Sequence, residues 1–192
     1  MKKIIFSLMT LMTLVMVMGV VSAVLSGVSF GNPTQGQNVS GTLQVNWTNA
    51  DSWSPLALQY LEDCNQSKTW QDLSTNIPTS TTTYDWDTTA RNDEKHCLRI
   101  LYFTNESISG NFTIDNTKPN PIIVRTGNLI VGETLTFNAS TSSDVGTGIE
   151  TYEWYLPNGS MITGVSTTYA FTSAGTYDVQ LTVKDYAGNS NS

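Results

Sequence analysis

Apolar and polar side chains alternate along several short stretches of this chain. In the clearest stretch, Tyr177, Val179, Leu181 and Val183 alternate with polar residues, after a turn-forming Ser-Ala-Gly at 173–175. A period of two places the apolar side chains on one face, as in an antiparallel strand that packs on a core. Tyr177 stands just after the turn, as in a tyrosine corner, where the hydroxyl bonds back to nearby backbone.

The same pattern, broken by turn residues, runs through the rest of the chain. We predict strands at residues 24–30, 41–48, 56–61, 68–73, 82–86, 96–104 and 107–115, and again at 122–124, 133–139, 149–156, 166–171 and 177–183. Short strands separated by turns are typical of immunoglobulin-like Greek-key sandwiches. The fold class predicted is therefore all-β, with two such sandwiches in tandem.

Prolines separate the two sets of strands. Pro119 and Pro121 restrict the backbone around them, which favours a stiff, extended connector. We therefore place a linker at 116–121, between one sandwich at 24–115 and a second at 122–192.

The second set of strands ends without a counterpart of residues 107–115, which close the first. We expect the second sandwich to lack its last strand, which would expose a sheet edge. The chain would then continue beyond Ser192, or another chain would supply the strand.

The N-terminus has the pattern of a signal helix. Lys2 and Lys3 precede an apolar run from residue 4 to 21, and small residues end at Ala23. This arrangement predicts a signal peptide at 1–23 that is cleaved after Ala23. An uncleaved anchor is the alternative, because the apolar run approaches the length of a membrane span.

The net charge of the chain limits the classes of partner that we expect it to bind. Without Lys2 and Lys3 the chain keeps seven basic residues against sixteen acidic ones, a net charge of −9. Such a surface repels nucleic acid and disfavours anionic membranes. We expect a secreted or cell-surface protein whose partners are other surface proteins or polysaccharide. Membrane contact would come only through an uncleaved anchor or through sequence beyond the C-terminus.

Cys64 and Cys97 are the two cysteines. An even pair in an exported chain predicts one disulfide. In an immunoglobulin-like order the third and sixth strands are antiparallel neighbours, which brings the end of one beside the start of the other. Both cysteines lie at that point.

The second half resembles a known family. The segments FNASTSSDVGTGIETYEW at 137–154 and AGTYDVQLTVKD at 174–185 closely resemble the polycystic-kidney-disease (PKD) domain. The resemblance implies an immunoglobulin-like sandwich of the kind repeated in surface proteins and archaeal surface layers. Such sandwiches are, by the same resemblance, also expected as appended domains of secreted proteases and polysaccharide hydrolases. The family usually has Asp-Phe-Gly-Asp-Gly where this chain has YLPNG at 155–159, so no role of those acids is carried over.

Residues 24–115 resemble another kind of repeat more loosely. The ending FTIDNTKP at 112–119 and the strand pattern are similar to fibronectin type III or immunoglobulin-like repeats of prokaryotic surface proteins.

Catalytic chemistry finds little support in the sequence. His96 is the single histidine, and its neighbour Cys97 should face the opposite side of the strand, which separates them as an acid–base pair. A zinc site from His96, Cys64 and Cys97 would lack a fourth ligand and the usual spacing. We expect His96 to be structural and the protein not to be an enzyme.

Acidic pairs more often lie on solvated loops than in a cleft. Hydrolysis would need two acids that converge. Calcium is an alternative near Asp144 and Asp185, which offer hard oxygen ligands but no complete ligand loop. No other cofactor and no metal ligand is predicted. The acidic pairs are Asp85 and Asp87, Asp93 and Glu94, and Glu150 and Glu153.

Tryptophans suggest a second kind of site. Trp47, Trp86 and Trp154 alternate with polar residues and are expected in the cores. Trp53, in a loop, is the candidate for contact with carbohydrate.

Glycosylation sequons are frequent. Those at Asn65, Asn105 and Asn158 lie in or near turns and are the candidate glycan attachment sites. The alternative is chance, because Ser and Thr are abundant.

The combined expectation is a non-enzymatic extracellular module that acts as a spacer, scaffold or adhesion surface. The alternatives are a polysaccharide-binding module and the non-catalytic appendage of a secreted hydrolase.

Overall fold

The computed structural model describes residues 28–49, 55–65, 67–103 and 105–192. The predicted signal peptide and Trp53 lie outside these residues. All regular elements in the described part of the chain are β-strands, as predicted. Within it, no helix has the length and apolar character needed to cross a membrane.

Two sheets form the N-terminal sandwich. One sheet has the order β1 (Val28–Asn32), β3 (Thr42–Asn49), β6 (Thr83–Asp87). The other has the order β2 (Asn38–Val39), β9 (Phe112–Ile114), β7 (Lys95–Tyr102), β4 (Leu56–Glu62), β5 (Gln71–Ile77). Apolar side chains from both sheets form one core, in which Trp47 and Trp86 are buried as predicted.

The expected pairing of the third and sixth long strands is present. β4 and β7 are antiparallel, and Leu61 lies opposite Cys97. This register brings Cys64 to Cys97, and the structure contains a disulfide between them with a Cα–Cα distance of 5.2 Å.

The strand predicted at 107–115 is wrong as a single element. It forms β8 (Asn105–Ile108) and β9, both antiparallel to β7. Between them the Ser109 hydroxyl accepts a hydrogen bond from the Leu98 amide at 2.9 Å, which interrupts the ladder. The interruption shifts the alternation, so Ile108, predicted on the apolar face, is 44% exposed.

The C-terminal sandwich repeats this plan with fewer strands. One sheet has the order β10 (Val124–Thr126), β11 (Thr134–Asn138), β14 (Ser166–Ala170). The other has the order β13 (Met161–Thr163), β12 (Ile149–Tyr155), β15 (Gln180–Asp185), β16 (Ser190–Asn191). The fully buried Trp154 lies in the centre of the core, as predicted.

The strand predicted at 177–183 begins three residues later than expected. Its partner β12 ends at Tyr155, which lies opposite Gln180, so residues 177–179 have no backbone to pair with on that side. Tyr177 is therefore 39% exposed. Its hydroxyl nevertheless donates to the Ser173 carbonyl at 3.1 Å, the contact expected of a tyrosine corner.

At the edge of this sheet the structure differs from the expectation of no closing strand. Ser190 and Asn191 form β16 and pair with Lys184 and Val183 of β15. This strand is only two residues long.

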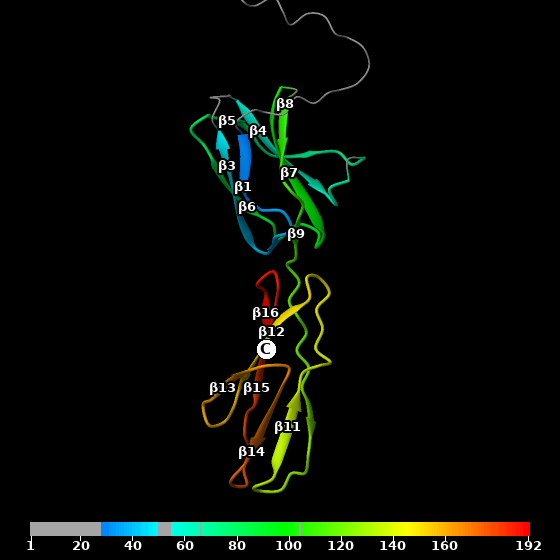
Figure 1. The fold of residues 1–192 in the computed structure, drawn as a ribbon, viewed down its shortest axis with the longest axis vertical. Helices are drawn as coiled ribbons and strands as arrows, with labels where there is room; N and C mark the ends of the chain where they lie inside the picture. Colours follow the sequence, from blue (N-terminus) through cyan, green and yellow to red (C-terminus); the bar gives the residue numbers. More distant parts are fainter. Residues whose placement is uncertain (1–27, 50–54, 66, 104) are drawn as a thin grey trace, which may run out of the picture.

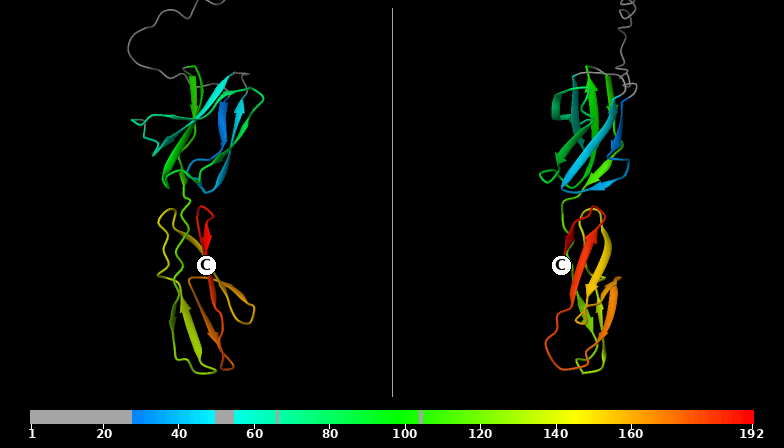
Figure 2. Two further views of the ribbon diagram at one scale, coloured as in Figure 1. Left: turned by 180° about the vertical axis from the view of Figure 1, so that it is seen from behind. Right: turned by 90° about the vertical axis from the view of Figure 1, so that its left-hand side faces the viewer.

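The two sandwiches lie end to end and give an elongated molecule (Figures 1 and 2). The chain leaves β9, passes through the connector and continues along the C-terminal sandwich. The turn between β15 and β16 lies at the end of the C-terminal sandwich that faces the N-terminal one (Figure 1).

Candidate functional site

The junction between the sandwiches is held by polar contacts. Asp115, directly after β9, accepts hydrogen bonds on Oδ2 from the Thr147 amide at 2.6 Å and the Thr147 hydroxyl at 2.7 Å. The Asn189 side-chain amide donates to the Asp115 carbonyl at 2.8 Å. Ser40 donates its hydroxyl to the Ala187 carbonyl at 2.9 Å. Loops of the C-terminal sandwich are thus joined directly to the N-terminal one.

Three carboxylates converge at this junction. Asp115, Asp144 and Asp185 each contribute an oxygen, and these oxygens lie within 4.8 Å of one another. Asp115 and Asp185 are 0% exposed. At an effective dielectric constant near 20, two such charges repel by about 3.5 kcal/mol. A cation would remove that cost.

Local backbone conformation aims each carboxylate inward. Asp185 Oδ1 accepts hydrogen bonds from the amides of Ala187 and Asn189, at 2.9 and 2.8 Å, in the turn after β15. Asp144 Oδ2 accepts from the amides of Gly146 and Gly148, at 3.1 and 2.7 Å. These bonds fix Asp144 and Asp185, as the Thr147 bonds fix Asp115, without neutralising the combined charge of the three.

One oxygen of the cluster lacks a hydrogen-bond partner. Asp144 Oδ1 is shielded from solvent and accepts no hydrogen bond from the described residues. Carboxylate oxygens are the ligands that calcium prefers, and calcium tolerates irregular arrangements of six to eight oxygens. The donor set therefore fits a calcium ion, with Asp115, Asp144 and Asp185 as the residues that would hold it.

The sequence predicts no metal ligand and offers the hard oxygens near Asp144 and Asp185 only as an alternative calcium site. It places Asp115 at the end of a strand, and the structure brings all three together. The sequence does not show that residue 115 folds back onto the loop at 144–148, because the connector lies between them. The fit between Gly146 and the Asp115 carboxylate, which a side chain at residue 146 would overlap, is visible only in the structure.

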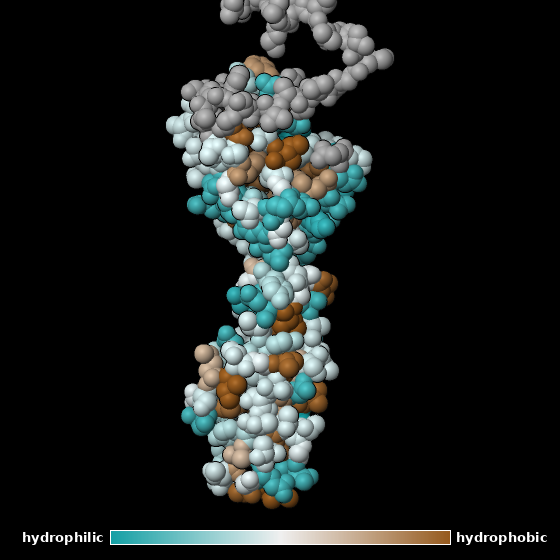
Figure 3. Space-filling view, viewed as in Figure 1, coloured by the Kyte–Doolittle hydropathy of each residue, from teal (hydrophilic) through white to brown (hydrophobic). Residues whose placement is uncertain are grey.

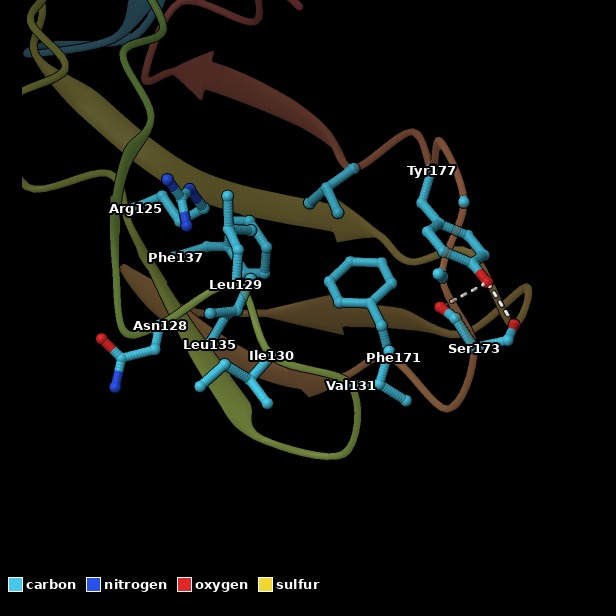
Figure 4. A pocket seen from close by; sticks show the side chains of 13 residues that line it. Arg125, Asn128, Leu129, Ile130, Val131, Leu135, Phe137, Phe171, Ser173 and Tyr177 are labelled. Atoms are coloured by element: carbon cyan, nitrogen blue, oxygen red, sulfur yellow. Dashed lines mark hydrogen bonds between the residues drawn. The ribbon is translucent and has the colours of Figure 1, made fainter.

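A second candidate site is an apolar cavity at the far end of the C-terminal sandwich. It has a volume of about 510 Å³ and lies between the loop after β10 and the segment from Phe171 to Val179 (Figure 4). Phe137 and Phe171 line its interior, and Leu129, 77% exposed, lies at its mouth. Brown, apolar side chains reach the surface at this end of the molecule, beside teal, polar ones (Figure 3). The cavity can shelter apolar groups, and Arg125 is the charged side chain in its lining.

His96 lies inside the N-terminal sandwich rather than in a cleft. Its ring centroid is 6.1 Å from that of Trp86 and 6.2 Å from that of Phe112. Nδ1 lies 3.0 Å from the Glu94 carbonyl oxygen, to which it donates. Burial lowers the pKa of His96 below its ordinary value, which favours the neutral ring.

The remaining acidic pairs make separate local contacts. Thr89 donates to Asp87 from its hydroxyl and its amide, and these hydrogen bonds lower the pKa of the Asp87 carboxyl. Asp93 accepts a hydrogen bond from the Asn116 amide at 2.7 Å, which secures the start of the connector. Glu150 forms an ion pair with Lys184 at 3.1 Å.

The candidate glycan sites differ in exposure. Asn65 and Asn158 are exposed in turns, whereas Asn105 is half-buried at the start of β8. Their modification stays a prediction.

Comparison with known families identifies the type of domain in the C-terminal half. Residues 116–192 match the family model of the PKD domain. The C-terminal sandwich is a PKD domain. Its matched segment begins directly after Asp115, so the carboxylate cluster lies where the PKD domain meets the preceding sandwich.

One curated protein and one solved structure are examples of what this chain is similar to. Collagenase ColA of Clostridium perfringens (strain 13 / Type A) is 28% identical over 108 residues, which cover 47% of this chain and 10% of the collagenase. The match therefore spans about a tenth of that relative's length. The crystal structure of chicken CNTN1 FN1–FN3 domains covers 86% of this chain and 61% of its own, with 8% identity and a TM-score of 0.43.

Proposed function

We propose that this protein is a non-catalytic spacer and interaction module of an exported protein, in which a PKD domain is docked rigidly onto a second immunoglobulin-like domain. The PKD match and the similarity to a segment of a collagenase support a module that accompanies other activities. The disulfide supports an extracellular location.

The observation that carries this proposal is the junction. A flexible tether would leave the end of the first sandwich solvated, but Asp115 is fully buried against the loop that carries Thr147. Asn189 bridges the Asp115 carbonyl and the Asp185 carboxylate with its side-chain amide, each at 2.8 Å. Breaking the junction would expose these groups together, so the two domains move as one body.

Calcium at the three aspartates completes this arrangement. The ligands come from both sides of the junction, so one ion would link the end of the first domain to two loops of the PKD domain. The shielded and unpartnered Asp144 Oδ1 supports this part of the proposal.

Interdomain distances test both parts. Spin labels at Ser80→Cys and Thr168→Cys, one in each domain at exposed positions, should give one narrow distance distribution in calcium and a broader one after chelation. Asp185→Asn should broaden it in calcium, whereas Asp72→Asn, an exposed control in β5, should not. A broad distribution in every condition would overturn the spacer. A distance distribution that stays narrow both after chelation and in Asp185→Asn would overturn the calcium site alone.

The collagenase similarity favours a second candidate, the non-catalytic appendage of a secreted hydrolase. In that case residues 24–192 should co-sediment with insoluble collagen and leave it intact. Co-sedimentation with insoluble polysaccharide instead, lost in Trp53→Ala, would favour the carbohydrate alternative. If the protein is retained neither on collagen nor on polysaccharide, both binding functions are rejected. The spacer proposal then stands without these ligands.

A further inference from the structure

A second group of potential metal ligands lies at one end of the β4–β7 pair, apart from the aspartate cluster. Glu62, the last residue of β4, is paired directly with His96 near the start of β7. Directly opposed residues of an antiparallel pair present their side chains on the same face. Glu94 precedes His96 by two residues, and this spacing also favours the same side.

The three side chains converge. A ring nitrogen of His96 and one carboxylate oxygen each from Glu62 and Glu94 lie within 4.8 Å of one another. His96 is 0% exposed, whereas both glutamates are half-buried, so the group lies at the boundary between core and solvent.

Two atoms of the group lack partners although they are shielded from solvent. Because Nδ1 of His96 donates to the Glu94 carbonyl, Nε2 carries the lone pair, and it accepts no hydrogen bond from the described residues. Glu94 Oε1 is likewise buried and unpaired. Buried polar atoms are rarely left without a partner, because the loss of hydration costs about 1–3 kcal/mol each.

The neighbouring cation, Arg91, forms no ion pair with the carboxylates in the described part of the chain. Arg91 donates a hydrogen bond from Nη1 to the Tyr60 hydroxyl and lies 4.9 Å above the Tyr60 ring centroid. Within the described residues, neither Glu62 nor Glu94 forms a salt bridge with it. Arg91 is near enough to act electrostatically on His96, but within the described residues the two carboxylates have no ion-pair partner.

We propose that His96, Glu62 and Glu94 bind a divalent transition-metal ion of the zinc type. Imidazole nitrogen with two carboxylate oxygens suits zinc, and water completes the tetrahedral set. The Nδ1–H bond to a backbone carbonyl fixes the ring, as is usual for metal-bound histidine. Imidazole is not a ligand that calcium prefers, so the site differs in chemistry from the aspartate cluster.

The bound ion links the end of β4 to the segment before β7, close to the disulfide. Its role is structural, because both glutamates and the histidine come from elements that this end of the sheet must hold together. Zinc binding therefore raises the melting temperature of the N-terminal sandwich.

The single histidine makes the test direct. In tag-free protein, correlated ¹H–¹⁵N spectra of the imidazole report His96 alone. After chelation and dialysis into excess calcium, one equivalent of zinc should shift a ring-nitrogen resonance and raise the melting temperature by several degrees. The double variant Glu62→Gln/Glu94→Gln should show neither effect, whereas Asp63→Asn, an exposed neighbour, should show both.

Three results would overturn the inference. These are an unchanged ring-nitrogen resonance in wild type, the same zinc response in the double variant, or a zinc response lost equally in Asp63→Asn. The double variant must first match the circular dichroism of metal-free wild type. If it does not, the single variant Glu94→Gln, whose Oε1 is unpaired, replaces it and should weaken zinc binding at least tenfold. Unchanged zinc affinity in that variant would overturn the inference equally.

Discussion

Replacing Gly146 by alanine tests whether the buried junction holds the domains together. Gly146 has no left-handed backbone conformation, so alanine is acceptable locally. Its methyl group, however, would overlap the carboxylate of Asp115, which belongs to the preceding sandwich. The carboxylate must then move away from Thr147, which donates two hydrogen bonds to it.

The size of the effect follows from those two bonds. Hydrogen bonds to charged groups contribute about 1.5–3 kcal/mol each, so their joint loss costs about 3 kcal/mol or more. A change of about 3 kcal/mol alters the ratio of docked to undocked molecules roughly 100-fold. The domains should separate while each core stays folded, because neither core contains Gly146.

The double spin-label measurement can detect this separation. Gly146→Ala should broaden the interdomain distance distribution and increase the radius of gyration in solution scattering. Gly175→Ala is the matched control, because a methyl group there makes only an ordinary contact with Tyr177 at 3.4 Å. An unchanged distribution in Gly146→Ala would refute the reasoning, since the junction would then tolerate the loss of its central contact.

Further predictions concern stability. Replacing both Cys64 and Cys97 by alanine opens a loop with a sequence separation of 33, which should lower the free energy of unfolding by about 4 kcal/mol; equal urea midpoints would contradict this. Tyr177→Phe removes the hydrogen bonds to Ser173 and should cost about 1 kcal/mol in the PKD domain by thermal melting, with no change in the other domain. Ser109→Ala leaves a buried amide of β7 unpaired and should cost about 1–2 kcal/mol, measured by denaturation with the PKD domain as internal reference.

Much of the fold could be predicted from the pattern of side chains. Period-two alternation located β3, β4, β6 and β7 within about two residues, because one face of each strand lies on a core. Alternation gives the wrong strand bounds where it continues past the end of the partner strand or past a group that interrupts the pairing. At Tyr177 the missing partner is the end of β12, and after Ile108 the interrupting group is the Ser109 hydroxyl.

The candidate sites were less predictable than the strands. A ligand set depends on distances between segments, and sequence spacing does not encode them. From the sequence, a zinc site of His96, Cys64 and Cys97 lacks a fourth ligand and the usual spacing; the structure brings Glu62 and Glu94 to His96 instead.

The sequence by itself determined the all-β class, the central Trp154 and the family of the second half, since each depends on local alternation or on short motifs. Tertiary structure alone decided which distant polar groups meet. Asp115 reaches Asp144 and Asp185 only because the connector lets the sandwiches lie end to end. Glu62 reaches His96 only through the register of β4 on β7. Burial then gives these contacts a large energetic effect, because charges removed from water must be compensated by the groups that surround them.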